Sequence, residues 1–526
     1  DRGTREKPDA HEPDPIPSLD SVQPTHHADE DDPVSAPVRL ADARHLIDGR
    51  EVDSASGRTF TTIDPSTGAE LARVAFGEAE DVDRAVRSAR AAFLAGTWSR
   101  LAPGERAKRM RRLAELIHAA ADRIGAIESR DTGKPLGQAT AEVHVGADFL
   151  TYFAGHAELP DGRTYPVDAG YFVYSKREPY GVVGAISPWN YPFLLACWKT
   201  APALAVGNSV VLKMAEQTPL STSELGRLAL EAGIPAGVLN IVHGDGPTTG
   251  ASLVAHPLVP KLTFTGSTAV GQAILRSAAD HVKSVHLELG GKTPNLIFAD
   301  AEIDQAVAGS LFTAFYNTGQ ICTSGSRLLV ERSVADRVIA AFVERAGKIR
   351  VGDPAAGGTQ LGPLISAEQH ARVTGYIAEG LREGATLALG GGRGPVTGSG
   401  GYYVEPTIFT GVRPEMRIAQ EEIFGPVLSV ITFDDEEEAL RIANDVMYGL
   451  AATVWTTDLR RAFRVAERLE AGIIWTNCPH YLPVNVPYEG HKLSGLGEDL
   501  GIEALQTFTH LKTHAINHGG GSMGWA

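Results

Sequence analysis

The 526-residue sequence predicts an α/β fold with two α/β domains and a small β-extension. Between residues 182 and 288, short runs of β-branched residues alternate with helical stretches, a pattern typical of a parallel sheet with crossover helices. A second alternating region extends from residue 304 to about residue 489 and indicates a second α/β domain. Two polar, extended segments fit neither pattern, and we assign them to the extension.

Each region has its own predicted elements. Ahead of the first sheet, apolar residues recur at three- and four-residue steps over 81–93 and 105–127, which predicts amphipathic helices. The strands predicted for the first sheet are 182–186, 209–213, 238–242, 261–265 and 284–287. The elements predicted for the second domain are helices 334–348 and 436–444 and strands 427–432 and 451–455.

The two extended segments, 170–179 and 507–517, could pair as strands outside both cores. Their free edges would then bind another subunit. Residues 1–38 are rich in proline and acidic residues and lack a periodic apolar pattern. We therefore expect them to form a disordered or loosely docked extension.

The composition excludes several classes of protein. A hydrophobic content of 43% supports a large core, and a net charge of −16 would repel nucleic acid and anionic membranes. No apolar run approaches the roughly 18 residues that cross a bilayer, and the N-terminus is not a secretory signal, so we expect a cytoplasmic protein. Cys197, Cys322 and Cys478 are too few and too far apart for a disulfide framework or a zinc site.

The segment from Phe315 to Arg327 holds a candidate nucleophile. Small residues flank Cys322 in Gly-Gln-Ile-Cys-Thr-Ser-Gly and leave room for a substrate. A thiolate is a strong nucleophile toward a carbonyl carbon. Free cysteine is also among the most buried residue types, so an inert core cysteine is the alternative.

Two polar residues upstream could assist such a nucleophile. Glu288 ends a predicted strand and precedes Leu-Gly-Gly, where a carboxylate could act as a general base or be a solvated loop acid. Asn190 lies in a turn set by Pro188 and Pro192. Its amide could donate to an oxyanion, or it could satisfy the local backbone.

A cofactor site is indicated between these segments. Lys213 and Glu216 end a predicted strand and could bind ribose hydroxyls. Gly266 and Ser267 lie between a strand and a helix, where amides and hydroxyls bind phosphate oxygens. The pattern departs from G-x-G-x-x-G, because the acid precedes the glycine loop.

In order and spacing, these five segments closely resemble the aldehyde dehydrogenase superfamily over roughly residues 45–512. Further matching segments are Leu361-Gly-Pro-Leu364, Glu421-Glu422-Ile-Phe424-Gly-Pro-Val427, Tyr448-Gly-Leu-Ala451 and Lys492-Leu-Ser-Gly495. The resemblance implies an NAD-binding domain with a variant dinucleotide-binding sheet at 39–156 and 180–290, and a catalytic domain at 291–490. Segments 157–179 and 491–526 would form an oligomerisation region and tail, giving a homodimer or homotetramer.

The same resemblance implies a mechanism. Cys322 would attack an aldehyde, and the oxyanion of the thiohemiacetal would be held by the Asn190 amide and the Cys322 backbone N–H. Hydride would pass to the nicotinamide, and water activated by Glu288 would hydrolyse the thioester. Relatives that transfer the acyl group to coenzyme A tend to lack this glutamate, so we expect a free acid product.

NAD is the implied cofactor, with no metal. Glu216 would repel a 2′-phosphate, which favours NAD over NADP. The implied cofactor-binding residues are Ile186, Ser187, Pro188, Trp189, Lys213, Glu216, Gly246, Phe264, Gly266, Ser267, Leu289, Glu422 and Phe424.

The substrate tunnel is expected to be mainly apolar and aromatic. By position its residues are Leu195, Trp198, Tyr316, Ile321, Thr323, His480, Leu482 and Tyr488. Such a lining favours an aromatic or medium-length aliphatic aldehyde over an anionic semialdehyde. A betaine-type aldehyde is the alternative, because aromatic rings also bind quaternary ammonium groups.

The chain departs from the family at three places, of which Met214, in place of a common proline, is expected to have little effect on the chemistry. Glu489 stands where relatives have glycine, which would change a loop or the tunnel mouth. Glu498 and Asp499 stand where many relatives carry Arg-Glu, and Asp499 could relay protons over a shorter reach. Two other classes stay open: a non-catalytic structural homologue, and a cysteine hydrolase or acyltransferase without redox chemistry.

Overall fold

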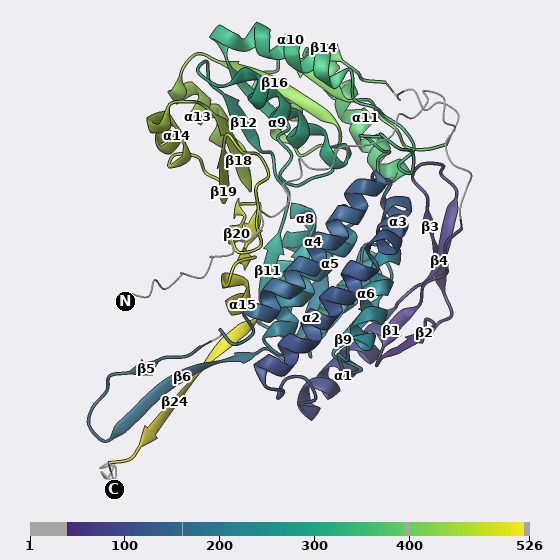
Figure 1. The fold of residues 1–526 in the computed structure, drawn as a ribbon, viewed down its shortest axis with the longest axis vertical. Coiled ribbons are helices and arrows are strands. Elements are labelled where there is room, and N and C mark those ends of the chain that lie inside the picture. The colour runs from purple at the N-terminus through teal and green to yellow at the C-terminus, as the bar shows by residue number, and fades with distance from the viewer. Residues whose placement is uncertain (1–38, 160, 393, 395–399, 520–526) are drawn as a thin grey trace, which may run out of the picture.

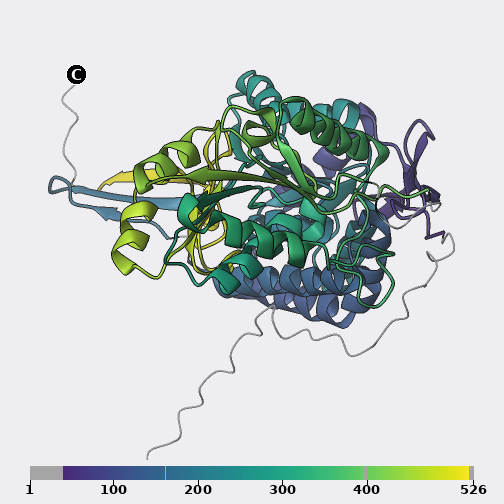
Figure 2. The same ribbon diagram turned by 90° about the horizontal axis from the view of Figure 1, so that it is seen from above.

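Two separate β-sheets organise the part of the chain that the structure describes (Figure 1). The structure is a computed structural model that describes residues 39–159, 161–392, 394 and 400–519. The extension expected over residues 1–38 lies outside the described residues. Figure 2, seen from above, shows the C-terminal strand pair projecting to one side of the molecule.

The first sheet has eight strands in the order β2-β1-β9-β8-β7-β10-β11-β22. Its strands are β1 His45–Ile47, β2 Arg50–Val52, β7 Val182–Ile186, β8 Ser209–Lys213, β9 Leu239–Val242, β10 Lys261–Thr265, β11 Ser284–Glu288 and β22 Gly495–Leu496. The central strands from β9 to β11 are parallel, as predicted. Every residue of β7 and β8 is buried, because helices cover both faces of a parallel sheet.

Helices from the first half of the chain pack on this sheet, and Figure 1 shows α2, α4 and α5 side by side. Their bounds are α1 Ala79–Ala95, α2 Pro103–Ala119, α3 Ala121–Thr132, α4 Leu136–Gly155, α5 Pro192–Ala205, α6 Leu220–Glu231, α7 Ala251–Ala255 and α8 Thr268–Ala279. The single helix expected over 105–127 is wrong, since the backbone breaks at Ala120 (φ −104°, ψ 6°). Ile117 and Ile124 are both fully buried, so the apolar spacing continues across the break and does not reveal it.

The second sheet has seven strands in the order β14-β15-β16-β13-β12-β18-β19. Its strands are β12 Pro294–Ile297, β13 Arg327–Glu331, β14 Thr386–Leu389, β15 Thr407–Thr410, β16 Val427–Phe433, β18 Ala451–Trp455 and β19 Ile473–Thr476. Its helices are α9 Ile303–Phe315, α10 Ala335–Ala346, α11 Ala367–Arg382, α12 Arg417–Gln420, α13 Glu436–Asn444 and α14 Leu459–Ala466. The predicted second α/β region is confirmed.

The two extended segments pair outside both sheets. β6 (Tyr171–Pro179) and β24 (Thr509–Asn517) are antiparallel over their whole length, and β5 (Thr164–Tyr165) adds a third strand. This pairing confirms the expectation for 170–179 and 507–517. Figure 1 shows the pair projecting from the body of the molecule.

The remaining strands are short. They are β3 Thr59–Ile63, β4 Glu70–Ala75, β17 Tyr448–Gly449, β20 Tyr488–Glu489, β21 His491–Lys492 and β23 Glu498–Asp499, followed by helix α15 Glu503–Thr507. The sequence placed residues 495–496 in the oligomerisation region. In the structure they form β22, because Gly495 pairs with Glu288 at the edge of the first sheet. The chain thereby returns to the end of β11 and brings Asp499 with it.

Among the described residues, no helix combines the length and apolar character needed to span a bilayer.

Candidate active site

A cavity of about 530 Å³ opens between the first sheet and the second α/β region. It is lined by the ends of β10 and β11, by helices α4 and α5, and by the segments around Cys322, Glu422 and Tyr488. This volume is within the range of small-molecule sites. Cys322, Glu288 and Asn190, which are far apart in the sequence, all lie on its wall.

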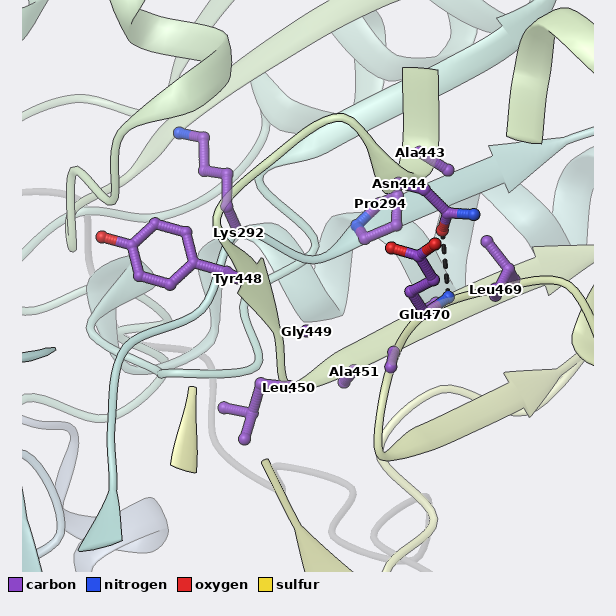
Figure 3. Close-up of a pocket in the computed structure, with 12 residues that line it drawn as sticks. Lys292, Pro294, Ala443, Asn444, Tyr448, Gly449, Leu450, Ala451, Leu469 and Glu470 are labelled. Atoms are coloured by element: carbon purple, nitrogen blue, oxygen red, sulfur yellow. Dashed lines mark hydrogen bonds between the residues drawn. The ribbon is translucent and has the colours of Figure 1, made fainter. Parts of the chain in front are cut away.

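A second cavity lies beside β17 and β18 and is shown in Figure 3. Its volume is about 10 Å³, which is space for about one water molecule. The Glu470 backbone N–H donates to the Asn444 side-chain oxygen on one side, while the Lys292 ammonium points to the opposite side of the view (Figure 3). We therefore take the larger cavity as the candidate active site.

Cys322 lies in the turn between a short 3₁₀ segment, Tyr316–Gly319, and strand β13. Its Sγ is 3.9 Å from the Tyr488 hydroxyl. Burial, together with the nearby Glu288 and Glu422 carboxylates, raises the pKa of the thiol to about 12, against lowering by Tyr488 and the Thr323 backbone. The thiol is therefore protonated at neutral pH and needs a base.

The glycines after Glu288 allow the strand end to approach this thiol. A Cβ on Gly291 would collide with the backbone oxygen of Cys322, and a Cβ on Gly290 would lie 2.5 Å from a Glu422 oxygen. Gly291 N–H also donates to Glu422 Oε1 at 2.9 Å. The Glu-Leu-Gly-Gly sequence thus brings β11 against the Cys322 segment.

Glu288 is the last residue of β11, as the sequence predicted, and it is buried. Neither carboxylate oxygen has a hydrogen-bond partner among the described residues. Burial raises its pKa well above the ordinary value; Asp499 adds to this, Lys199 opposes it, and Glu489 raises it slightly. A carboxylate with a raised pKa is a stronger base once it is ionised.

Asn190 is buried in the turn after β7. Its Nδ2 donates to the Gln320 carbonyl at 2.9 Å, which leaves one amide hydrogen for a second acceptor. Its backbone carbonyl accepts from Lys134 Nζ at 2.9 Å and from Asn317 Nδ2 at 3.1 Å. Hydrogen bonds to both the side chain and the backbone of Asn190 therefore hold the turn in place.

The sequence reasoning missed the buried ion cluster that holds this turn. Lys134 Nζ contacts Glu142 Oε2, and it lies 3.8 Å from Glu128 Oε1. Glu142 lines the cavity, and its other oxygen accepts from the Tyr316 hydroxyl at 3.3 Å. Burial raises the pKa of Glu142 to about 7, opposed by Lys134. Lys134 and Glu142 are only 8 positions apart, but no motif marks their segment, and Tyr316 is 174 positions away.

The predicted cofactor residues divide into two groups. Those that line the large cavity are Pro188, Trp189, Gly266, Ser267, Leu289, Glu422 and Phe424. Those outside its lining are Ile186, Ser187, Lys213, Glu216, Gly246 and Phe264. Most of the second group lies at the carboxyl ends of β7, β8 and β10, where α/β sheets bind ligands.

Two of these cofactor residues have a defined local geometry. Lys213 Nζ is 3.3 Å from Glu216 Oε2, so the two side chains lie together as the sequence expected for a ribose site. Ser267 caps α8, and its Oγ accepts from Val270 N–H at 3.4 Å. The first turn of α8 therefore starts at the predicted phosphate-binding position.

All eight predicted substrate residues line the cavity: Leu195, Trp198, Tyr316, Ile321, Thr323, His480, Leu482 and Tyr488. Trp198 packs edge-on against Tyr488 and against Phe149, with ring centroids 5.7 Å and 5.3 Å apart. His480 Nε2 lies 3.3 Å from Thr323 Oγ1, and burial lowers its pKa to about 4. Further lining residues that the sequence reasoning missed are Phe149, Phe312, Gln369, Arg372 and Trp475.

Helix α11 brings Gln369 and Arg372 to the cavity, and this helix was not predicted. Gln369 Nε2 donates to the Phe424 carbonyl at 2.7 Å, and Arg372 donates to the Glu422 carbonyl. The helix buries Val373 and Ile377, and this spacing could have revealed it.

Glu489, expected to alter a loop or the tunnel mouth, pairs with Glu498 in the two-stranded β20–β23 ribbon. It does not line the cavity. Asp499 does line it, beside Glu288. Glu489 therefore lies in a ribbon outside the cavity lining, whereas Asp499 reaches the site itself.

Comparisons with known proteins agree with this geometry. The "Aldehyde dehydrogenase family" profile matches residues 52–514. The chain is 45% identical over 490 residues to "Aldehyde dehydrogenase family 2 member B4, mitochondrial" of Arabidopsis thaliana, covering 93% of this chain and 90% of that protein. It is 44% identical over 484 residues to "Benzaldehyde dehydrogenase, mitochondrial" of Antirrhinum majus, covering 92% and 90%.

A solved indole-3-acetaldehyde dehydrogenase in complex with NAD+ matches with a TM-score of 0.89 at 44% identity, covering 90% of this chain and 97% of that one. Sequence identity at this level over nearly the whole chain goes with the same fold. The chain belongs to the aldehyde dehydrogenase family.

Proposed function

We propose that this protein oxidises an aldehyde to the carboxylic acid with NAD, through a thioester on Cys322. The observation that carries the proposal is the shared cavity wall formed by Cys322, Asn190 and Glu288. A thiol, an amide donor and a buried carboxylate are the groups that this reaction needs.

The residues at the ends of the first sheet fit NAD. Lys213 and Glu216 offer a donor and an acceptor for ribose hydroxyls. Ser187 Oγ is buried with no hydrogen-bond partner among the described residues, which suits a position that a ligand completes. Glu216 disfavours a 2′-phosphate, and the matched indole-3-acetaldehyde dehydrogenase was solved with NAD+, so we favour NAD over NADP. When bound, NAD supplies the acceptor for the hydride that leaves the substrate.

In the first half of the reaction, Glu288 takes the proton of the Cys322 thiol. The sulfur forms a bond to the aldehyde carbon, and the carbonyl oxygen becomes an oxyanion. The free amide hydrogen of Asn190 and the Cys322 backbone N–H donate to that oxygen. Loss of hydride from the same carbon leaves a thioester on Cys322.

Before the second half, Glu288 releases the thiol proton to solvent. It then takes a proton from water, and the hydroxide adds to the thioester carbon. The carbon–sulfur bond breaks, the acid leaves, and the sulfur returns as the thiolate. Glu288 has no competing hydrogen bond among the described residues, which suits a base that must serve two proton donors in turn.

We propose an aromatic aldehyde as the substrate. The cavity carries the rings of Phe149, Trp198, Tyr316, Trp475 and Tyr488, and such walls bury aromatic rings favourably. Two of the matched relatives are named for benzaldehyde and indole-3-acetaldehyde, which supports an aromatic over a betaine-type aldehyde. A medium-length aliphatic aldehyde fits the same lining.

A panel of aldehydes tests this proposal. NADH absorbance should appear with benzaldehyde and indole-3-acetaldehyde, more weakly with hexanal, and least with betaine aldehyde. Cys322→Ala should abolish the signal, while Cys478→Ala, a change at an exposed free thiol, should retain it. Absence of NADH with every aldehyde, together with intact ester hydrolysis, would favour the cysteine hydrolase alternative; absence of both activities would favour a non-catalytic homologue.

We propose that the β6–β24 pair mediates homodimer or homotetramer formation. β24 is the outer strand of its sheet, and the pair exposes Phe172, Leu511 and Ile516 at 46%, 58% and 48%. A free strand edge with apolar side chains pairs readily with a second copy. Light scattering should give a dimer or tetramer mass, and Leu511→Lys with Ile516→Lys should lower it.

We propose a cytoplasmic location. All three cysteines are free thiols in the structure, as in a reducing compartment. The two plant relatives are named as mitochondrial proteins, so fractionation of cells expressing the full chain is the deciding measurement.

A further inference from the structure

His286 is a buried histidine that the proposed mechanism does not use. It lies on β11 two residues before Glu288, so both side chains emerge on the same face of the strand. Its Nε2 is 3.7 Å from Glu288 Oε1 and 3.7 Å from Asp499 Oδ1. The histidine nitrogen and all four carboxylate oxygens lack hydrogen-bond partners among the residues that the structure describes.

The other ring nitrogen fixes the tautomer. His286 Nδ1 lies 3.1 Å from Thr263 Oγ1, and Lys199 Nζ donates to the same hydroxyl at 3.2 Å. An ammonium can only donate, and Lys199 and His286 are the two partners of this hydroxyl among the described residues, so its hydrogen is directed to His286 Nδ1. The ring proton is therefore on Nε2, which faces Glu288 and Asp499.

The charges around the ring keep it neutral. Burial holds the pKa of His286 well below its ordinary value, and Lys199 and Lys261 lower it further, against a smaller opposite effect of the Gly497 backbone. Burial raises the pKa of Asp499, while Lys199, the Trp198 indole and Lys261 lower it. Two cations thus already balance the two carboxylates, which disfavours a divalent metal ion between them.

The structure has one N–H facing two carboxylates. We propose that His286 is a positioning residue that shares its Nε2–H between Glu288 and Asp499 and donates it to whichever carboxylate is ionised. The proposal rests on the proposed function, since Glu288 must be the base.

This arrangement has a consequence for catalysis. While Glu288 is ionised, the N–H stabilises it and points it in a fixed direction. When Glu288 takes a proton from the thiol or from water, the His286 N–H turns to Asp499. The N–H therefore still has an acceptor while Glu288 is protonated. His286 itself gains and loses no proton in this exchange.

Two substitutions at His286 separate a shared donor from a packing role. His286→Gln keeps an N–H near the position of Nε2, and His286→Leu fills similar volume without a donor. The measurement is the pH profile of kcat for benzaldehyde oxidation and for 4-nitrophenyl acetate hydrolysis, which needs no hydride transfer. Thermal melting of each variant checks that the fold is retained.

A donor to the ionised carboxylate lowers its pKa, so removing the donor raises it. We expect the acid limb of both profiles to move up by about one pH unit in His286→Leu and to stay near wild type in His286→Gln. Equal shifts in the two variants, or no shift in either, would overturn the shared donor.

Glu288→Gln separates this inference from the proposed function. If Glu288→Gln keeps the wild-type profile, Glu288 is not the base and the proposed mechanism is wrong. If Glu288→Gln loses turnover while His286→Leu keeps the wild-type acid limb, only the role of His286 is wrong. If His286→Leu does not fold, His286→Asn, which lacks a donor at the Nε2 position, should show the same upward shift, and a wild-type acid limb in it would overturn the role.

Discussion

Two groups of buried carboxylates border the same cavity and differ in how their oxygens are satisfied. In the first, which we call the paired cluster, Lys134 lies between Glu128 and Glu142, and both Glu142 oxygens accept hydrogen bonds. Glu128 accepts from the Phe193 N–H through Oε2, and its Oε1, without a hydrogen-bond partner among the described residues, lies 3.8 Å from the Lys134 ammonium. In the second, the unpaired cluster of His286, Glu288 and Asp499, no carboxylate oxygen has a hydrogen-bond partner among the described residues.

The difference separates structural support from chemistry. Lys134 of the paired cluster also holds the backbone of Asn190 at 2.9 Å, so this cluster fixes the turn that carries the oxyanion donor. The oxygens of Glu288 and Asp499 are free to exchange protons with the thiol, with water or with each other. Burial raises the pKa of carboxyls in both clusters, so a raised pKa alone does not identify the base.

The strongest test of this contrast compares two Glu→Gln substitutions. Glu288→Gln removes the base for both halves of the reaction, and we expect kcat to fall by about 10²–10⁴-fold with a slower pre-steady-state burst of NADH, because the Cys322 thiol and the water both lose their proton acceptor. Stopped-flow absorbance measures both quantities. Glu142→Gln is the matched control and should lower kcat by less than about tenfold. Equal losses in the two variants would remove the distinction between the clusters.

The next test removes the cation of the paired cluster. Lys134→Met leaves Glu128 and Glu142 buried without their counter-ion, and we expect a loss of about 3–5 kcal/mol in the free energy of unfolding, measured with urea. Lys108→Met, which breaks the exposed contact between Lys108 and Glu105, should leave the unfolding curve unchanged. A Lys134 variant as stable as wild type would show that the cluster does not support the fold.

A third test uses pH. Because burial and Asp499 raise the pKa of Glu288, kcat should rise as the pH passes well above the ordinary glutamate range of about 4.3. Asp499→Asn removes the negative neighbour, which lowers the pKa of Glu288 and should move the acid limb to lower pH. Asp499→Asn and His286→Leu are therefore expected to move the acid limb in opposite directions. An upward shift in Asp499→Asn would contradict the description of the unpaired cluster.

The smallest expected effect is that of Tyr316→Phe. The hydroxyl donates to Glu142 at 3.3 Å, and its loss should cost about 1 kcal/mol of stability while the ring still lines the cavity. Thermal melting measures the loss of stability, and KM for benzaldehyde measures whether the ring still contributes to the cavity wall. A large loss of kcat would place Tyr316 in the chemistry and not in the paired cluster.

Patterns that are local in the chain were predicted well. The strands 182–186, 209–213 and 261–265 and the helix 436–444 match β7, β8, β10 and α13, because β-branched runs and apolar spacing depend on neighbouring residues. The break between α2 and α3 was missed for the same reason, since apolar spacing continues across it. Helix α11 was missed although its apolar spacing is present.

Among the site residues, those in segments matching the family could be named from the sequence, and their roles stay predictions. The structure adds that Cys322, Glu288 and Asn190 share one cavity wall. Lys134 and Glu142 were missed because nothing in their own segment marks them as part of a site.

The sequence by itself determined the α/β class and most strands of the first sheet. It also identified the candidate nucleophile, base and oxyanion donor, because each of these features depends on residues that are adjacent in the chain. Only the tertiary structure decided which carboxylates are paired and which are not. Glu142 meets Tyr316 across 174 positions, and His286 meets Asp499 only because β22 returns the chain to β11. Hydrogen bonding and desolvation of a buried carboxylate depend on atoms within a few ångströms in space, whatever their separation along the chain.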